Sequence, residues 1–362
     1  MKKRILFSLI FIALLFLLAE LFARAYYYRK PAKSISALYE LMRTTKRALF
    51  NKSPKKGIDN SNHYLIRPGV SKEVNDSIAA ENRIANYSIY QPWIEFRFGN
   101  IHGKYVNAFD QVRKSDPEIS APGGDPLIVW FLGGSTMFGH NLTDAETIPS
   151  AFVREYRQRG GRPIRVVNYG TPFYFSYHEL IQLSDNLFRG KRPDVVIMLD
   201  GLNEGAAPFA SYTRNPFHTP RMQELLNPEL YSYPEKFDYY RFPDSTKIQE
   251  VSQGIFDNYF ENIGNAKKLA DQYQFKLYCF WQPVSYFDYP NRASDPICNK
   301  KTLKQFDYIC PQVKKKAEEV DYLFYLGDML REAKLPFIDG GHYAPWMCEA
   351  IAKRMLDSVG LK

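Results

Sequence analysis

The stretch that decides the fold is Leu127-Ile-Val-Trp-Phe-Leu-Gly133-Gly134-Ser135-Thr136. Six apolar residues that mostly favour β structure stop at two glycines and a hydroxyl, which is typical of a buried parallel strand ending at the carboxyl edge of a sheet. Because α/β proteins place their sites at that edge, Ser135 is a candidate nucleophile. A serine after two glycines is also a common helix N-cap. Partner residues elsewhere in the chain have to decide between the two interpretations.

From this stretch onward, predicted strands alternate with predicted helices, which indicates a parallel sheet with right-handed crossovers. A capping box, Thr143-Asp-Ala-Glu146, opens the first helix, which we expect to run to about residue 158. Further helices are predicted near 177–187, 248–272, 313–333 and 346–359. The five predicted strands are 127–132, 164–169, 195–199, 275–281 and 335–338.

Polar residues and glycine follow four of these strands. Ser135 follows the first strand, Gly170 the second, and Asn203 the third, while Asp339 and His342 follow the fifth. Since the carboxyl ends of parallel strands converge on one crevice, we expect these five residues to meet although they are far apart in the chain.

These residues belong to four short blocks that resemble, in order, blocks I, II, III and V of the SGNH (GDSL-like) hydrolase family. The resemblance covers residues from about 126 to 358. It implies a three-layer α/β/α sandwich of the flavodoxin-like kind and no cofactor. It also implies that Ser135 is the nucleophile and that His342 is the base, oriented by the Asp339 carboxylate. The implied oxyanion donors are the N–H groups of Ser135 and Gly170 and the side chain of Asn203. The blocks are Gly133-Gly-Ser-Thr136, Asn168-Tyr-Gly170, Gly201-Leu-Asn-Glu204 and Asp339-Gly-Gly-His342.

Two departures from the family pattern bear on subfamily and substrate more than on catalysis. The first block has Gly-Gly-Ser-Thr instead of Gly-Asp-Ser, and Glu204 stands where an aspartate often follows the asparagine. The Gly-x-Ser-x-Gly pattern is absent, which excludes the nucleophile elbow of α/β-hydrolases. Asp200 and Glu204 are acids near the predicted site, but we assign them no catalytic role.

The proposed chemistry requires these residue types. A serine hydroxyl attacks an ester only if a base takes its proton, and His342 is that base. Asp339, three residues earlier on one turn, can reach the other ring nitrogen. Backbone and amide N–H groups can then stabilise the oxyanion. The structural alternatives are a buried histidine at 342 and a turn-forming asparagine at 203.

The N-terminus predicts a membrane anchor. Met1-Lys-Lys-Arg4 precedes an uncharged run over 5–19, a single Glu20, and three further apolar residues. The run is long enough to span about 30 Å of hydrocarbon and longer than a usual cleavable signal core. We therefore expect a signal anchor over 1–25, an accessory stalk with a hairpin over 26–125, and a catalytic domain over 126–362, placed outside the cytoplasm. A cleavage pattern at Ala23-Arg24-Ala25 leaves a secreted form as the alternative.

The composition and charge limit the classes of binding partner that we expect. The 362 residues carry a formal net charge of +9, but the basic residues are scattered or lie near the N-terminus, so we expect membrane-surface attraction and no nucleic acid. No histidine or cysteine spacing fits a metal site. We expect a disulfide between Cys298 and Cys310 in a polar insertion. Cys279 and Cys348 are either buried thiols or a second bridge.

The sequence thus predicts a serine esterase acting on an acyl or O-acetyl ester of an envelope glycan or lipid. An irregular segment over 206–244 is too long for an ordinary connection, and we expect a flap over the site. Its aromatic residues can stack on sugar rings, receive an acyl chain, or simply pack together. The alternatives are an O-acyltransferase with the same triad and a non-catalytic envelope assembly protein. The flap aromatics are Phe209, Tyr212, Phe217, Tyr231 and Tyr233.

Overall fold

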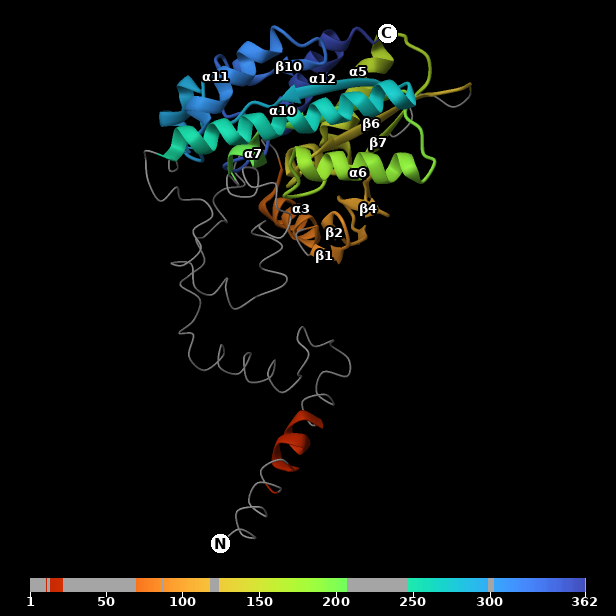
Figure 1. Ribbon diagram of the computed structural model, residues 1–362, viewed down its shortest axis with the longest axis vertical. Coiled ribbons are helices and arrows are strands. Elements are labelled where there is room, and N and C mark those ends of the chain that lie inside the picture. Colours follow the sequence, from red (N-terminus) through yellow and green to blue (C-terminus); the bar gives the residue numbers. More distant parts are fainter. Residues whose placement is uncertain are drawn as a thin grey trace. The chain divides into compact units, whose positions relative to one another are not determined.

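The computed structural model describes residues 11, 14–21, 70–85, 88–117, 124–206, 247–298 and 303–361 (Figure 1). The chain divides into two units, Met1–Asn62 and His63–Lys362. The described residues of the first unit are helical. Across the described ranges, no helix is both long and apolar enough to cross a membrane. Most of the predicted anchor over 1–25 lies outside those ranges.

The second unit is built on a mixed sheet of eight strands in the order β10-β9-β8-β6-β7-β5-β4-β3. The first five strands in that order are parallel, and numbered along the chain they follow the flavodoxin-like sequence 2-1-3-4-5. The chain adds strands in one direction and then in the other, and this direction reverses at β6, the strand that leads to Ser135. The parallel strands are β6 (Leu127–Gly133), β7 (Ile164–Asn168), β8 (Val195–Asp200), β9 (Lys276–Trp281) and β10 (Leu323–Tyr325).

The predicted fifth strand over 335–338 is wrong. That segment makes one isolated bridge, between Phe337 and Tyr343. The fifth parallel strand is β10, inside the segment predicted as a helix over 313–333. Helix α11 (Phe306–Ala317) ends early, and a 3-10 turn, η7 (Gly327–Leu330), follows β10. Pairing of Leu323 with Cys279 buries β10 against β9, and this tertiary contact outweighs the helix propensity of the Lys- and Glu-rich run before it.

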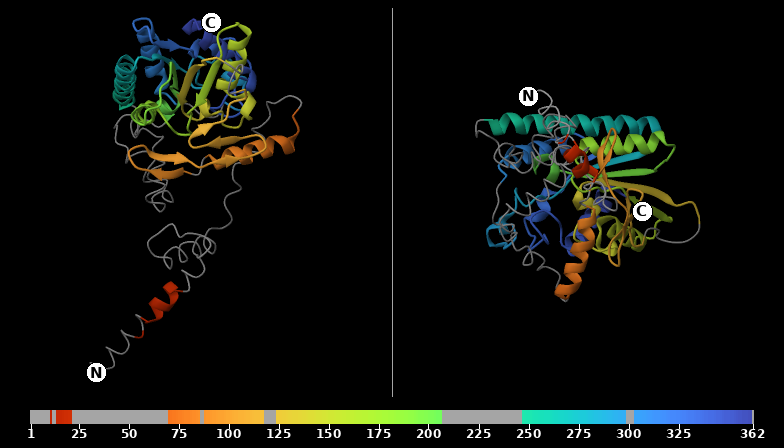
Figure 2. Two further views of the ribbon diagram at one scale, coloured as in Figure 1. Left: turned by 90° about the vertical axis from the view of Figure 1, so that its right-hand side faces the viewer. Right: turned by 90° about the horizontal axis from the view of Figure 1, so that it is seen from below.

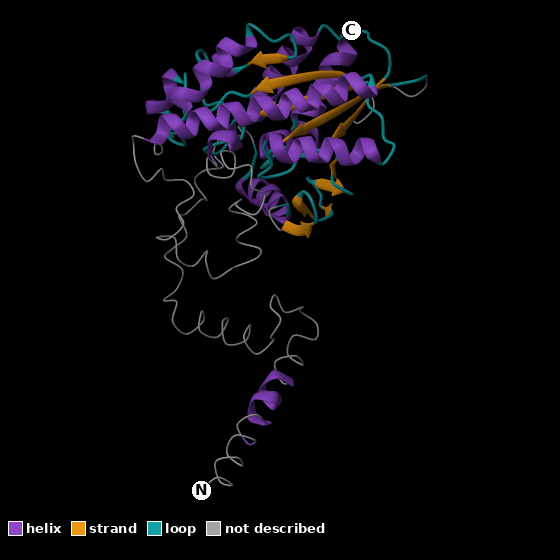
Figure 3. Ribbon diagram, in the orientation of Figure 1, coloured by secondary structure: helices purple, strands orange, loops and turns teal. Residues whose placement is uncertain are grey.

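Helices cover both faces of the sheet and give three layers. Alternate side chains of β6 enter opposite cores: Val129 and Phe131 face one, and Trp130 and Leu132 the other. On the first face lie α5 (Ile148–Gln158) and α12 (Pro345–Val359). On the second lie α6 (Ser176–Phe188), α10 (Ile248–Tyr273) and α11, of which α6 and α10 run across the front of the sheet in Figure 3.

The cysteines form no disulfide, so the predicted Cys298–Cys310 bridge is wrong. Cys298 packs in the core on the α5 and α12 face, whereas Cys310 packs on the α10 and α11 face. Cys279 and Cys348 are likewise divided between the two faces. The sheet therefore separates both pairs, and all four are buried thiols.

The accessory region adds antiparallel strands, so the sheet is larger than the five parallel strands predicted. Helix α3 (Lys72–Ile84) precedes a separate hairpin of β1 (Ser88–Gln91) and β2 (Glu95–Phe98). Strands β3 (Ile101–His102), β4 (Asn107–Phe109) and β5 (Val112–Arg113) then extend the main sheet, coloured orange in Figure 2. One residue pair, Arg113 with Asn168, joins this extension to β7.

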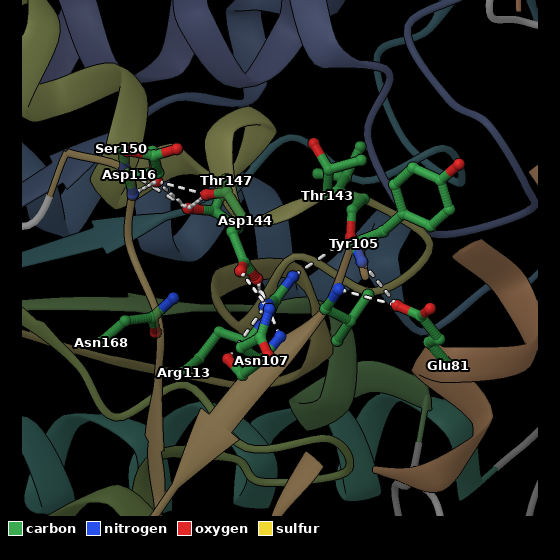
Figure 4. A network of polar contacts seen from close by, with 12 residues as sticks. Glu81, Tyr105, Asn107, Arg113, Asp116, Thr143, Asp144, Thr147, Ser150 and Asn168 are labelled. Carbon is green, nitrogen blue, oxygen red and sulfur yellow. Dashed lines mark hydrogen bonds and ion pairs between the residues drawn. The ribbon is translucent and has the colours of Figure 1, made fainter. Parts of the chain in front are cut away.

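A buried polar network fastens the extension to the parallel part of the sheet (Figure 4). The Arg113 guanidinium pairs with Asp144 and donates to the Leu142 carbonyl at 3.2 Å. Asp144 also accepts from the backbone N–H of Asn107 at 2.9 Å. Burial lowers the pKa of Arg113 to about 9, so the guanidinium stays charged at neutral pH. It lies 5.2 Å from the ring centre of Phe138, which belongs to the helix that begins at Ser135.

Candidate active site

Ser135 begins the short helix α4 (Ser135–Phe138) directly after β6 and the Gly133–Gly134 pair. The glycines are required for packing. A Cβ on Gly134 would lie 2.4 Å from the Asn203 amide nitrogen, and one on Gly133 would lie 2.5 Å from the Met137 Cβ. The first N–H groups of a helix have no partner within it. The N–H of Ser135 therefore stands at the start of α4 beside its own hydroxyl.

Ser135, His342 and Asp339 form a connected chain of hydrogen-bonding groups. His342 Nε2 lies 2.8 Å from Ser135 Oγ, and His342 Nδ1 lies 2.7 Å from Asp339 Oδ2. An ionised carboxylate only accepts, so Nδ1 carries the hydrogen and Nε2 accepts from the serine. The His342 and Asp339 side chains are 20% and 23% exposed. The three residues predicted from separate strand ends thus meet at one partly open position.

Asp339 is surrounded by donors. Its Oδ1 accepts from the N–H groups of Gly341 at 2.9 Å and His342 at 2.8 Å, and its Oδ2 accepts from the Asn141 amide at 2.8 Å. Desolvation alone would raise the pKa of Asp339, but the charge and hydrogen bond of His342 and the Gly341 N–H outweigh it and hold that pKa well below its usual range. Asp339 is therefore ionised, as an orienting carboxylate must be.

A second histidine packs on the first. The His140 ring centre lies 4.7 Å from that of His342, at an interplanar angle of 42°. Burial, followed by the nearness of His342, lowers the pKa of His140 to about 3. His140 is therefore a neutral ring against the imidazole. Sequence reasoning assigned it no chemistry, and also missed Asn141; the available signal was a His-Asn pair just after the serine-bearing helix.

Gly170 and Asn203 both lie against the turn that carries Ser135. A Cβ on Gly170 would lie 2.3 Å from the Phe138 nitrogen, so only glycine fits against α4 there. The Gly170 N–H donates to Asn168 Oδ1 at 2.9 Å. The Asn203 amide donates to the Tyr174 carbonyl at 2.6 Å, which fixes its orientation and leaves its second hydrogen for another acceptor. Tyr174 is a further contact that the sequence did not indicate.

Three buried carboxyls lie at the end of β8. Glu204 accepts from the N–H groups of Gly201 at 2.7 Å and Ser176 at 2.8 Å, and so connects the turn before Asn203 to the start of α6. Burial, then the negative charges of neighbouring carboxyls, raises the pKa of both Glu179 and Asp200 well above the usual range. Burial also raises the pKa of Glu204. Within the described ranges, no group of histidine, cysteine and acidic residues has a geometry that could hold a metal ion.

The flap predicted over 206–244 lies, except for Ala206, outside the described residues, and so do its five aromatic residues.

Several solved structures are similar to this chain at low identity. They include a lipolytic protein of the G-D-S-L family from Desulfitobacterium hafniense, with 11% identity, coverage of 64% of this chain and 99% of that one, and a TM-score of 0.39. An acetylxylan esterase from Geobacillus stearothermophilus has 17% identity, coverage of 67% and 98%, and a TM-score of 0.37. A psychrotrophic esterase from Pseudoalteromonas has 15% identity, coverage of 65% and 97%, and a TM-score of 0.38.

No family model and no curated protein matches the chain.

Proposed function

We propose that the protein is a serine esterase that works through an acyl-enzyme. The observation that carries the proposal is the position of His342, with one ring nitrogen 2.8 Å from the Ser135 hydroxyl and the other 2.7 Å from the Asp339 carboxylate. A base must lie within hydrogen-bond reach of the nucleophile and be oriented by a third group, and His342 meets both conditions. The alternative that Ser135 is a helix N-cap is wrong, because the N-cap of α4 is Gly134 and no side chain bonds to that end of the helix.

Acylation begins when Ser135 Oγ attacks the ester carbonyl carbon while His342 Nε2 takes the hydroxyl proton. The carbonyl oxygen becomes an oxyanion, which accepts from the Ser135 N–H and the free amide hydrogen of Asn203. Asp339 stabilises the imidazolium that forms. Collapse of the tetrahedral intermediate breaks the ester C–O bond, and the leaving alcohol takes the proton from Nε2. The Gly170 N–H can join the oxyanion site only by sharing or leaving its bond to Asn168.

Deacylation repeats these steps with water. His342 takes a proton from the water as its oxygen attacks the acyl carbon, and Ser135 Oγ leaves with that proton. The products are a carboxylic acid and the free serine. An O-acyltransferase would replace water with an acceptor hydroxyl at this stage, without any change to acylation.

The substrate we propose is an acyl or O-acetyl ester of an envelope glycan or lipid, reached from the membrane surface. The support is the uncharged run over 5–19 behind Met1-Lys-Lys-Arg4, which predicts an anchor that leaves the remaining chain outside the cytoplasm. An alkaline phosphatase fused after residue 70 should be active in intact cells. An inactive fusion with full activity after cell lysis would contradict this placement.

The Ser135→Ala variant tests the nucleophile. We expect loss of p-nitrophenyl acetate hydrolysis and of labelling by a fluorophosphonate probe, with unchanged circular dichroism and melting temperature. The matched control is Ser184→Ala on α6, which removes a hydroxyl that, among the described residues, bonds only to the Leu180 carbonyl and should leave both readouts intact. Labelling of folded Ser135→Ala would refute the assignment and favour a non-catalytic role.

The fate of the acyl group needs a separate measurement. The acetyl-enzyme formed from p-nitrophenyl acetate is followed in water and with glycan acceptors. If the protein is a hydrolase, the acetyl-enzyme should lose its acetyl group in water when no acceptor is present. Negligible deacylation that an acceptor accelerates, with acetyl appearing on the sugar, would identify a transferase.

A further inference from the structure

A cavity lies next to the β1–β2 hairpin. It has a volume of about 370 Å³ and is lined by the β1–β2 hairpin, the β4–β5 turn and α6. Tyr169 and Tyr174 belong to its wall and flank the segment that carries Gly170, but none of the three triad residues lines it. In Figure 1 the hairpin lies below α6, on the side of the sheet where the accessory strands are added.

The most prominent side chain at this cavity is Trp93, in the turn of the hairpin. Its side chain is 90% exposed, and its backbone has a φ of 73°. Glu95, two residues later, has a φ of 72° and is fixed by burial next to His178 Nε2 at 3.3 Å. Positive φ angles are costly for residues other than glycine and concentrate at functional sites. The backbone of this turn therefore adopts a costly conformation, and in that conformation the large indole of Trp93 is exposed to water.

The polar lining includes four amides and five charged side chains, and two of the amides have an oxygen without a donor among the described residues. Gln182 is only 6% exposed, and its Oε1 accepts no hydrogen bond within the described ranges. Gln111 donates from Nε2 to the Phe98 carbonyl at 2.8 Å, while its Oε1 is buried without a donor there. Arg97 Nε is likewise buried, and it has no acceptor among the described residues. The four amides of the lining carry both donor and acceptor groups, as sugar hydroxyls do.

The charges of the lining nearly cancel. Arg189 Nε bonds to Asp185 at 2.9 Å, and Lys191 Nζ bonds to the Asn186 amide oxygen at 2.9 Å. Three cationic and two anionic side chains leave an excess of one positive charge. A nucleic acid or polyphosphate is recognised by several unopposed cations, which this cavity lacks. An acyl chain would cover the five charged side chains of the lining without offering them a hydrogen bond.

We propose that this cavity is a saccharide-binding site, in which a sugar ring stacks on Trp93 and its hydroxyls bond to the amides of Gln111 and Gln182. The proposal goes beyond the esterase function and does not rest on it, because binding here needs no triad residue. If both hold, the site retains a glycan chain away from the ester that is cleaved.

The test measures binding without turnover. Full-length Ser135→Ala protein, purified in detergent, is applied to an array of bacterial surface polysaccharides that also carries chitohexaose and xylohexaose. We expect retention on at least one saccharide. Adding Trp93→Ala should weaken that binding at least tenfold, as should adding Gln182→Leu, which keeps the side-chain volume. The control is Phe109→Ala, which removes a 65% exposed ring outside the cavity and should leave binding unchanged.

Folding of each variant is checked by its melting temperature, and Trp93→Ala should match the parent because the side chain is exposed. Absence of binding to every saccharide on the array would overturn the proposal. So would binding that survives Trp93→Ala, or that Phe109→Ala weakens equally. A change of oligomeric state on Trp93→Ala, with no saccharide bound, would show instead that the cavity receives a second copy of the chain.

Discussion

Asp339 lies in the turn that carries His342 and Asp200 lies at the end of β8, and their surroundings shift the pKa values of these two aspartates in opposite directions. Asp339 accepts from backbone N–H groups, an amide and an imidazole, and its pKa is held low. Asp200 ends β8 fully buried, its neighbours are the carboxyls of Glu179 and Glu204, and its pKa is raised well above the usual range. Burial acts to raise both pKa values, and only at Asp339 do a neighbouring imidazole and backbone donors outweigh it.

The largest effect should come from removing the charge of Asp339. Asp339→Asn keeps the shape but cannot stabilise the imidazolium, so we expect kcat for p-nitrophenyl acetate to fall by about 10⁴. Asp200→Asn, which removes no charge if Asp200 is protonated, should lower kcat by less than about tenfold. Equal losses of kcat in the two variants would show that the two aspartates do not differ in their effect on catalysis.

Next in size is Asn203→Ala, which removes the amide aligned by Tyr174 on the Asp200 side of the site. Loss of one oxyanion donor should slow acylation roughly 100-fold or more. Burst kinetics with p-nitrophenyl acetate measure the acylation rate directly. An unchanged burst rate would show that the amide serves only to hold the turn to the Tyr174 carbonyl.

The pH dependence of stability should also differ between the two aspartates. Because the folded state raises the pKa of Asp200, its contribution to the free energy of unfolding is full below about pH 4 and is lost as the pH rises. Asp200→Asn should therefore become more stable relative to the parent toward pH 9, by roughly 1.4 kcal/mol for each unit of raised pKa.

For Asp339, whose folded pKa is lowered, the contribution is present above about pH 4 and is lost only below it. Urea unfolding from pH 3 to pH 9 measures both profiles. A parent that gains stability steadily from pH 5 to pH 9 relative to Asp200→Asn would contradict the assignment.

The smallest expected effect is that of His140. Its neutral ring packs on His342 without repelling the imidazolium, and aromatic pairs contribute about 0.5–1.5 kcal/mol. His140→Ala should lower kcat about 2- to 10-fold, whereas His140→Phe should restore most of it. A loss in His140→Phe as large as in His140→Ala would mean that a ring nitrogen, and not the ring face, is required.

The residues that the sequence predicted at the site are those set by local chemistry. Glycine before Ser135 and the Asp-Gly-Gly-His turn have strong local signals. Thr143 and Glu146 form the predicted capping box, with the Thr143 N–H donating to Glu146 at 2.8 Å, but the box opens a 3-10 turn, η2 (Asp144–Glu146), and helix α5 begins after it with Thr147 as N-cap. The four longer parallel strands were likewise recognisable as apolar runs ending in glycine or polar residues.

What the sequence did not predict depends on tertiary contacts. The three-residue β10 exists because β9 provides a pairing edge, and its local sequence reads as helix. Cys298 and Cys310 are close in sequence but lie on opposite faces of the sheet. His140 matters because its ring meets that of His342, 202 positions later, and no local pattern signals such a contact.

The pairing of Arg113 with Asp144 has a consequence for how the chain can be divided. A fragment beginning at the predicted boundary of 126 would leave Asp144 without its cation, and removing one partner of a buried pair costs about 3–5 kcal/mol. It would also remove the contact between the guanidinium and Phe138, on the helix that begins at Ser135. The part of the chain after residue 126 is therefore stabilised by β5, which a transferable fragment should include.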